Sequence, residues 1–241
     1  MKILENLKSF VKYRNYSPAE SAYDLWAESY DLEKNNLMMH YDDIIFNQLI
    51  SHILFKNKTI VDFGSGTGRH IPDIMLKQPA DVICCDISNN MLSILKKKFP
   101  LLKAYLLKNN TLNFIDNKSI DILTTTLVIA HVEDLKILFK EWNRVLKEKA
   151  GIIITDFHPI LLQNGGKRIF NHNGKKVAIR NQIHNIHKIK SLLNEFGFRE
   201  KILIEKSITE DVRPFYENAN AINVYNQFYG KPFIYGMALE R

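Results

Sequence analysis

The 241-residue sequence predicts an α/β fold built on a doubly wound, seven-stranded and mostly parallel sheet. Three observations lead to this fold class. A glycine-rich turn, Gly64–Gly68, joins a short apolar segment to a helix-forming one. A second short apolar segment ends in the carboxylate of Asp86. Apolar segments of strand length then alternate with segments whose apolar residues recur at helical spacing, as in Leu135, Leu138, Phe139 and Trp142.

The individual elements follow from the pattern of apolar residues, as short apolar runs for strands and as helical spacing for helices. The residues that begin and end helices set their bounds. Strands are predicted at 59–63, 81–85, 102–107, 119–126, 151–157, 199–206 and 232–239. Helices are predicted at 19–30, 39–54, 69–77, 89–98, 134–147 and 186–196. Ser88 is suited to cap the N-terminus of the fourth helix, and Gly197 is suited to follow the last one.

Composition narrows the class of protein. With 46% hydrophobic residues the chain can bury one large domain core, and no apolar run is long enough for a membrane span. The start, Met1 to Glu5, has no apolar signal segment, so a cytoplasmic location is expected. The net charge of +7 comes from scattered lysines, which favours a solvated surface over a nucleic-acid interface. Adjacent Cys84 and Cys85 in one strand face opposite sides and are poor disulfide partners.

The glycine-rich turn predicts a ligand site. Its spacing, Gly64-x-Gly66-x-Gly68, differs from the Gly-x-Gly-x-x-Gly of dinucleotide sites, and no Gly-Lys-Ser/Thr marks a phosphate-binding loop. Asp62 precedes the turn and suits a cationic ligand better than a phosphate. Asp86 follows Gly68 by about 18 residues, close to the ~20 at which a βαβ unit brings an acid to a ribose.

Three blocks of the sequence resemble, in order, the motifs of class I S-adenosylmethionine-dependent methyltransferases. They are Val61–Gly68, Cys85–Leu92 and Ser119–Val132, and with a following block that ends at His158 the resemblance covers about 59–158. In that last block Glu148-Lys149-Ala150 replaces the proline and first glycine that the family usually has. The resemblance implies a Rossmann-like domain with a C-terminal antiparallel hairpin, and S-adenosyl-L-methionine as cofactor. The residues implied to bind it are Asp62, Gly64, Ser65, Gly66, Gly68, Asp86, Ile87, Met91, Asn110 and Leu127.

The N-terminal part adds a cap to this domain. Trp26-Ala27-Glu28-Ser29-Tyr30-Asp31 resembles the helix that closes over the cofactor in small-molecule methyltransferases, which implies that Tyr23 and Tyr30 contact cofactor or substrate. Trp26 is better explained as core. We therefore expect a helical cap at 1–55 and a cofactor domain at 56–241, with lid insertions at about 158–185 and 207–231. Asn173-Gly174 predicts a hairpin turn in the first insertion.

The implied reaction is an SN2 displacement that moves a methyl group to O, N or C of a small metabolite and leaves S-adenosyl-L-homocysteine. Alignment of the reactants supplies most of the catalysis, and a base is needed only for a protonated nucleophile. His131, His158 and His184 follow or precede strands and helices at the predicted ligand edge and are the candidate bases. Glu205 is a candidate for the substrate wall.

Other functions remain open at this point. Two alternatives are a non-catalytic, S-adenosylmethionine-binding regulatory subunit and a methyltransferase that acts on an acyl group bound to an acidic carrier protein. A nicotinamide-dependent oxidoreductase is disfavoured by the glycine spacing. Asp156 alone does not make a magnesium cluster, so no metal is expected. The sequence indicates a small-molecule substrate without identifying it, and it leaves the oligomeric state open.

Overall fold

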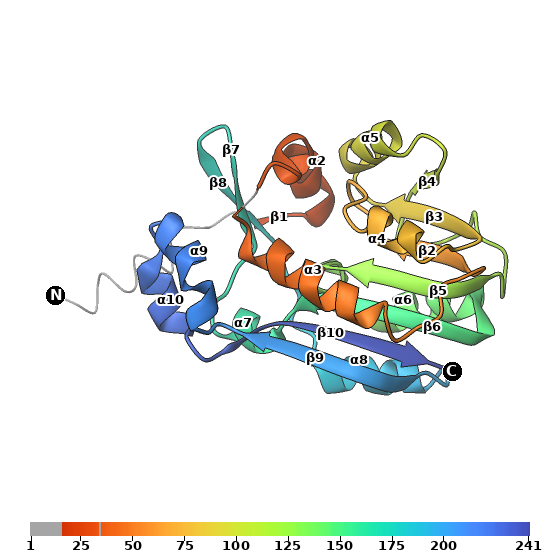
Figure 1. The fold of residues 1–241 in the computed structure, drawn as a ribbon. Helices are drawn as coiled ribbons and strands as arrows, with labels where there is room; N and C mark the ends of the chain where they lie inside the picture. The colour runs from red at the N-terminus through yellow and green to blue at the C-terminus, as the bar shows by residue number, and fades with distance from the viewer. Residues whose placement is uncertain (1–15, 34) are drawn as a thin grey trace.

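The computed structural model describes residues 16–33 and 35–241 (Figure 1). The strands are β1 (Tyr16–Ser17), β2 (Thr59–Phe63), β3 (Asp81–Asp86), β4 (Lys103–Leu106), β5 (Ile120–Thr126), β6 (Leu146–Phe157), β7 (Ile169–His172), β8 (Lys175–Ile179), β9 (Arg199–Ser207) and β10 (Pro232–Glu240). The α-helices are α2 (Ala19–Tyr30), α3 (Leu37–Leu49), α4 (Ile71–Leu76), α5 (Asn89–Lys98), α6 (Leu135–Val145), α7 (Pro159–Gln163), α8 (Ile186–Asn194), α9 (Arg213–Asn218) and α10 (Ile222–Phe228). Two short 3₁₀ turns are η1 (Ile129–His131) and η2 (Glu210–Val212).

Seven strands form the central sheet in the order β4-β3-β2-β5-β6-β10-β9. The strands from β4 to β6 pair in parallel, and β10 is inserted antiparallel between β6 and β9. The prediction of a mostly parallel sheet with a closing antiparallel hairpin is therefore confirmed. Because β2, β3 and β5 are adjacent and parallel, their carboxyl ends meet at one edge, where open α/β sheets bind ligands.

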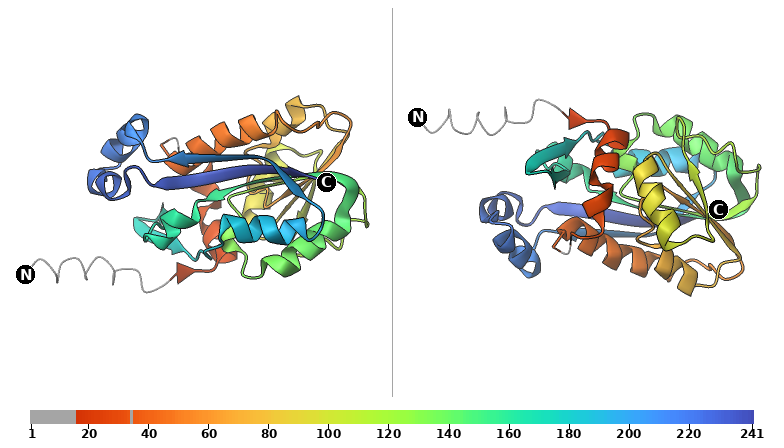
Figure 2. Two further views of the ribbon diagram at one scale, coloured as in Figure 1. Left: turned by 90° about the horizontal axis from the view of Figure 1, so that it is seen from below. Right: turned by 90° about the horizontal axis from the view of Figure 1, so that it is seen from above.

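Helices cover both faces of this sheet (Figure 2). One hydrophobic cluster joins α3, α4 and α5 to the sheet, and the other joins α6 and α8 to the opposite face. Successive residues of a strand alternate between the two: Ile60 and Cys84 belong to the first cluster, whereas Val61 and Cys85 belong to the second. This period of two is what buries a strand on both faces, and it separates the two cysteine side chains as expected.

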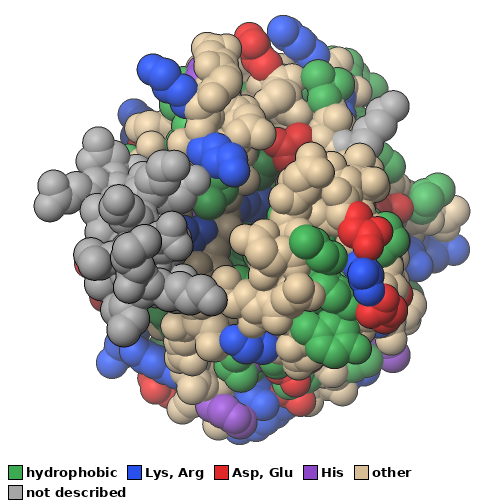
Figure 3. Space-filling model, turned by 90° about the vertical axis from the view of Figure 1, so that its left-hand side faces the viewer, with side chains coloured by type: hydrophobic (Ala, Val, Ile, Leu, Met, Phe, Trp, Pro, Cys, Tyr) green, Lys and Arg blue, Asp and Glu red, His purple; other side chains and the backbone are tan. Residues whose placement is uncertain are grey.

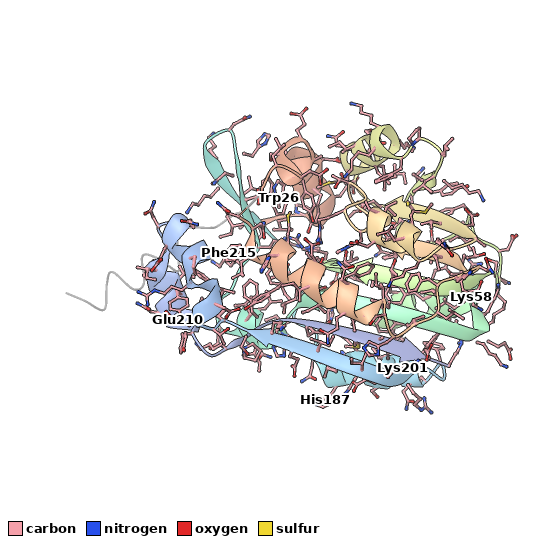
Figure 4. All side chains as sticks on the ribbon, in the orientation of Figure 1. Trp26, Lys58, His187, Lys201, Glu210 and Phe215 are labelled. Carbon is pink, nitrogen blue, oxygen red and sulfur yellow. The ribbon has the colours of Figure 1, made fainter. Side chains whose placement is uncertain are left out.

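A third, smaller cluster holds the cap. Trp26 of α2 is buried and stacks on Phe170 of β7, with ring centroids 4.6 Å apart (Figure 4 shows Trp26 on α2). The hairpin β7–β8 turns at Asn173-Gly174, both at positive φ, as its sequence predicts. The cap joins this hairpin through parallel pairing of Tyr16–Ser17 with Ala178–Ile179. Trp26 thus packs in a core, as predicted, between two segments far apart in the chain.

The predicted elements match the observed ones within a few residues at most ends. The largest differences are that α3 ends at Leu49 and that β6 begins at Leu146. Leu146 leaves the helix to pair with Ile120, and the register then shifts before Gly151 pairs with Ile122. The second insertion forms α9 and α10, and Phe215 of α9 lies 5.1 Å, centroid to centroid, from His40 of α3 (Figure 4).

The domain boundaries remain a prediction, and residues 1–15 of the expected cap lie outside the described part. In the described ranges, no helix has the length and apolar character needed to cross a membrane. Lys and Arg side chains are spread around the hollowed face in Figure 3 rather than gathered in one patch.

Candidate active site

A cavity lies at the carboxyl ends of β2, β3 and β5, beneath the cap helix α2. Its empty space, including the open mouth, is about 580 Å³, within the usual range of small-molecule sites. The lining residues are Tyr23, Tyr30, Phe63, Gly64, Gly66, Asp86, Ile87, Met91, Leu107, Asn110, Thr126, Leu127, Val128, His131, Val132 and Arg168. Most of the residues predicted to bind a cofactor are therefore brought together here from five separate parts of the chain.

The glycine turn is held by backbone hydrogen bonds to the neighbouring strand. The N–H groups of Gly64 and Ser65 both donate to the carbonyl of Cys85, at 2.8 and 2.9 Å. All three glycines have positive φ, which favours glycine at each position. Their surroundings differ, however: a Cβ at Gly64 would meet Val128 Cγ2 at 2.2 Å, whereas a Cβ at Gly66 would meet no atom of residues 16–33 and 35–241 within 4 Å. Gly66 is therefore the glycine that leaves space for a ligand.

Asp86 presents its carboxylate to the cavity in a fixed orientation. Its Oδ2 accepts from the N–H of Gly66 and its Oδ1 from the N–H of Ser88, each at 2.8 Å. A carboxylate oxygen has room for a second donor, so both oxygens can still accept a hydrogen bond. Burial raises the pKa of Asp86 to about 6, although the backbone donors from Ser88 and Gly66 oppose that rise.

Three predicted ligand residues do not line the cavity. The carboxylate of Asp62 accepts from the hydroxyl of Thr124 at 2.7 Å, and the Ser65 hydroxyl donates to the Asp62 carbonyl at 2.6 Å. Gly68 packs against the ring of Phe99, where a Cβ would approach to 2.9 Å. These three residues contact other protein groups and support the conformation of the turn on its side away from the cavity.

The wall opposite Asp86 carries a hydrogen-bonded pair. The Nδ1 of His131 lies 3.1 Å from the carbonyl of Arg180, which can only accept, so Nδ1 carries the proton. Nε2 is then an acceptor, and the Tyr23 hydroxyl donates to it at 3.0 Å. Burial and then the charge of Arg168 lower the pKa of His131 to about 3, and burial raises that of Tyr23. The proton therefore rests on Tyr23 and His131 is neutral.

The other two candidate bases lie elsewhere. His158 caps α7, accepting from the Ile160 N–H through Nδ1 at 3.2 Å, and its Nε2 donates to Glu205 at 2.7 Å. His184 donates through Nε2 to the Val132 carbonyl at 2.7 Å. It borders a separate cavity of about 180 Å³ next to Tyr235. Of the three histidines, His131 is the one that the described structure places on the larger cavity.

Arg168 is a lining residue that the sequence did not indicate. It is 4% exposed and comes from the first insertion, just before β7. Its neighbours in the sequence, Gly166 and Lys167, are typical of a solvated loop, and no motif distinguishes it from Lys167. Only the folding of the hairpin against α2 carries it into the cavity.

Comparison with known proteins identifies the class. Residues 61–154 match a family described as a methyltransferase domain. Over 145 residues the chain is 30% identical to the ubiquinone/menaquinone biosynthesis C-methyltransferase of Rickettsia typhi, covering 56% of this chain and 58% of that protein. The fold resembles a crystal structure of an S-adenosylmethionine-dependent methyltransferase from Mesorhizobium loti, with a TM-score of 0.62, 16% identity and coverage of 80% and 96%.

A second curated relative matches more of the chain than the Rickettsia protein does. A malonyl-[acyl-carrier protein] O-methyltransferase of Gallionella capsiferriformans is 25% identical over 202 residues, covering 76% of this chain and 66% of that protein. The chain thus spans less than two thirds of the Rickettsia relative and about two thirds of this one. Residues 61–154 therefore match a methyltransferase domain, and the fold is that of S-adenosylmethionine-dependent methyltransferases. The resemblance found in the sequence is confirmed.

Proposed function

We propose that this protein binds S-adenosylmethionine in the larger cavity and transfers its methyl group to a small-molecule acceptor. The observation that carries the proposal is the Asp86 carboxylate, fixed by two backbone donors beside a glycine whose Cβ position is open. A carboxylate in that setting can accept from both hydroxyls of a ribose. The bare backbone at Gly66 leaves room for the rest of the ligand to pass close by.

The remaining lining residues fit the other parts of the cofactor. Ile87, Met91 and Leu107 offer apolar surface next to Asp86, and the Asn110 side chain supplies an amide there. This is the composition expected around an adenine, whose amino group needs an acceptor. On the other side of the glycine turn, Leu127 has φ 59°, a strained conformation for a leucine, at the position where the methionine end would lie.

The bound cofactor would supply an already activated methyl group on a sulfonium. The chain has to align an acceptor with it and keep water away. Tyr23 and Tyr30 close the cavity from α2. We propose Tyr23, oriented by His131, as the polar group nearest the acceptor; with a pKa of about 3, His131 serves better as hydrogen-bond acceptor than as base. His158 and His184 remain proposed substrate residues only if an acceptor extends beyond this cavity.

Two acceptor classes are supported by relatives. The Rickettsia protein is described as a C-methyltransferase of quinone biosynthesis, and an apolar, aromatic cavity wall suits a flat acceptor of that kind. The Gallionella protein is described as acting on a malonyl group of acyl-carrier protein, and the net charge of +7 favours an acidic partner of that kind. Of these two, we propose a small-molecule acceptor as the main hypothesis and the carrier-bound acyl group as the alternative.

Calorimetric titration with S-adenosylmethionine, S-adenosylhomocysteine and NADH tests the cofactor. Binding of the first two in the micromolar range, with none of NADH, is expected. Asp86→Ala should weaken the binding of both by about 1–3 kcal/mol. Methyl transfer from radiolabelled cofactor to a quinol or to malonyl-carrier protein then separates the two acceptor classes. Failure of the wild type to bind either adenosyl ligand would refute the proposal, and binding without any transfer would support a regulatory subunit.

A further inference from the structure

Arg168 places a buried positive charge in the wall of the cavity. The side chain is 4% exposed, and its guanidinium carbon lies 5.3 Å from the ring centroid of Tyr23, 5.4 Å from that of Trp26 and 5.6 Å from that of Phe157. These three rings come from α2 and from the end of β6. Cation–π attraction to them offsets part of the cost of removing the charge from water.

No carboxylate within the described residues forms a salt bridge with Arg168. In this part of the chain Arg168 donates two hydrogen bonds, to the Leu127 carbonyl and to the Tyr30 hydroxyl, which are both 3.4 Å long and go to uncharged groups. The chain treats another largely buried arginine differently, because Arg69 contacts both Asp42 and Asp43. A guanidinium cannot lose its proton at physiological pH. The carboxylate that acts on Arg168 electrostatically, Asp156, accepts instead from the backbone N–H groups of Ala130 and Phe157, so no described carboxylate contacts the guanidinium directly.

The position of Arg168 shows which part of a ligand it faces. The sheet order places Asp86 at the end of β3, the glycine turn at the end of β2, and Leu127 just after β5. Arg168 contacts Leu127, so it lies across the glycine turn from Asp86. If Asp86 binds the ribose, Arg168 faces the methionine end of the cofactor and the space next to it where an acceptor enters.

We infer that Arg168 binds a carboxylate of a ligand in this cavity, and this inference rests on the proposed function. One guanidinium charge matches one carboxylate charge, and its planar fork can make two parallel hydrogen bonds to the two oxygens. A phosphate dianion would need further cations, and the cavity lining in the described residues contains no second Lys or Arg. The carboxylate can belong to the methionine end of the cofactor or to an acidic acceptor.

The test compares Arg168→Met and Arg168→Lys with the wild type and with a matched control, Arg213→Met. Arg213 lies on α9, is 46% exposed and pairs with Glu210 and Glu217 outside the cavity. Thermal melting first establishes that each variant is folded. Calorimetry then measures the binding of S-adenosylhomocysteine, of 5′-methylthioadenosine, which lacks the amino-acid end, and of benzoate to the S-adenosylhomocysteine complex.

If the carboxylate is that of the cofactor, Arg168→Met should weaken S-adenosylhomocysteine by roughly 10- to 100-fold and leave 5′-methylthioadenosine unchanged. Arg168→Lys should show a smaller loss because it keeps the charge without the fork. If the carboxylate belongs to the acceptor, both adenosyl ligands should bind as in the wild type, and benzoate binding should disappear with Arg168→Met. Arg213→Met should match the wild type throughout.

Two results would overturn the assignment while leaving the proposed function intact. One is equal weakening of S-adenosylhomocysteine and 5′-methylthioadenosine, which would show that Arg168 supports the shape of the cavity rather than a carboxylate. The other is unchanged adenosyl binding without any Arg168-dependent binding of benzoate. Failure of the wild-type protein to bind either adenosyl ligand would instead refute the proposed function, and the inference with it.

Discussion

Asp86 is the residue at which folding and ligand binding meet. The two backbone N–H groups that fix its carboxylate belong to the glycine turn and to the start of α5, so the same contacts orient the acid and join the two segments. Burial raises its pKa to about 6, which means that ionisation of the folded protein is less favourable than that of a free aspartate. A ligand that donates to the carboxylate favours the ionised form.

The affinity for S-adenosylhomocysteine should therefore depend on pH. Above about pH 7 Asp86 is ionised and the affinity should be constant. As the pH falls through the folded-state pKa of about 6, binding should weaken by up to tenfold per pH unit, because protonation competes with the ribose donors. Near pH 6, binding should release protons, which calorimetry in buffers of different ionisation enthalpy detects. An affinity that stays constant from pH 5 to 8 would contradict this role of Asp86.

Ionisation of Asp86 should also change the stability of the folded protein with pH, in the direction opposite to its effect on ligand affinity. Because the pKa of Asp86 is higher in the folded than in the unfolded state, the folded state binds more protons between about pH 4 and pH 6. Its contribution to the free energy of unfolding is therefore largest at low pH and is lost as pH rises through about 6. Ligand-binding competence and stability thus change in opposite directions over this interval.

The hydrogen bond between Tyr23 and His131 predicts that changes at these two buried residues have non-additive effects on the free energy of unfolding. Tyr23→Phe should lower the free energy of unfolding by about 1–3 kcal/mol, because the buried Nε2 of His131 loses its donor. His131→Leu combined with Tyr23→Phe should be less destabilising than the sum of the two single changes, since both partners are then removed. Urea denaturation of the four proteins measures this coupling. Tyr30→Phe, which removes only a 3.4 Å contact to Arg168, is the control. Strictly additive effects would show that the pair is not hydrogen-bonded.

Within the glycine turn, neighbouring glycines serve different purposes. Gly64 is required by the protein itself, because a Cβ there would overlap Val128. Gly66 is required by the proposed ligand, because no atom of the described residues lies within 4 Å of the position that a Cβ would take there. Positive φ values of 78° and 55° add a cost for any other residue at both positions.

Alanine at each glycine should separate these purposes. Gly64→Ala should lower the free energy of unfolding by roughly 2–4 kcal/mol, from overpacking against Val128 and from backbone strain together. Gly66→Ala should cost only about 1 kcal/mol of strain but weaken S-adenosylhomocysteine by at least about tenfold. Denaturation and calorimetry on both variants check this contrast. Wild-type affinity in a folded Gly66→Ala protein would place the ligand elsewhere.

For the whole molecule, a ligand in this cavity contacts the cap, the sheet and the first insertion at once. S-adenosylhomocysteine at 100 times its dissociation constant should stabilise the folded state by about 2.7 kcal/mol. In a protein of this size that corresponds to a rise in melting temperature of roughly 5–10 °C. Differential scanning fluorimetry measures the shift, and Asp86→Ala at the same ligand concentration should show a smaller one. An unchanged melting temperature would mean that the ligand does not bind the native fold.

Most of the fold could be predicted because its signals are local. Strands β2, β3 and β5 are short apolar runs bounded by turn residues, and α6 shows a clear apolar stripe from Leu135 to Val145. The glycine spacing and Asp86 could be recognised for the same reason. Tyr16–Ser17, by contrast, pairs with Ala178–Ile179 across more than half the chain, and nothing local to either segment indicates the partner.

The side of the cavity formed by Arg168 could not be predicted, because it also depends on contacts between residues far apart in the sequence. Arg168 reaches the cavity only because the β7–β8 hairpin packs on Trp26, a contact between residues widely separated in sequence. His158 and His184 were plausible from their positions next to strand and helix ends. Their side chains turn to Glu205 and to the Val132 carbonyl, and such orientations depend on tertiary neighbours that periodicity does not describe.

The burial of Cys84 and Cys85 has a practical consequence for spectroscopy. They are the two cysteines of the sequence, both are fully buried, and burial raises the pKa of each thiol, that of Cys84 to about 12. Thiolates are the reactive form, so a maleimide dye should leave the native protein unlabelled. A single cysteine at the exposed position Asn171 of β7 would then carry the dye alone. Its emission could follow the hairpin against α2 in real time, without first removing a native thiol.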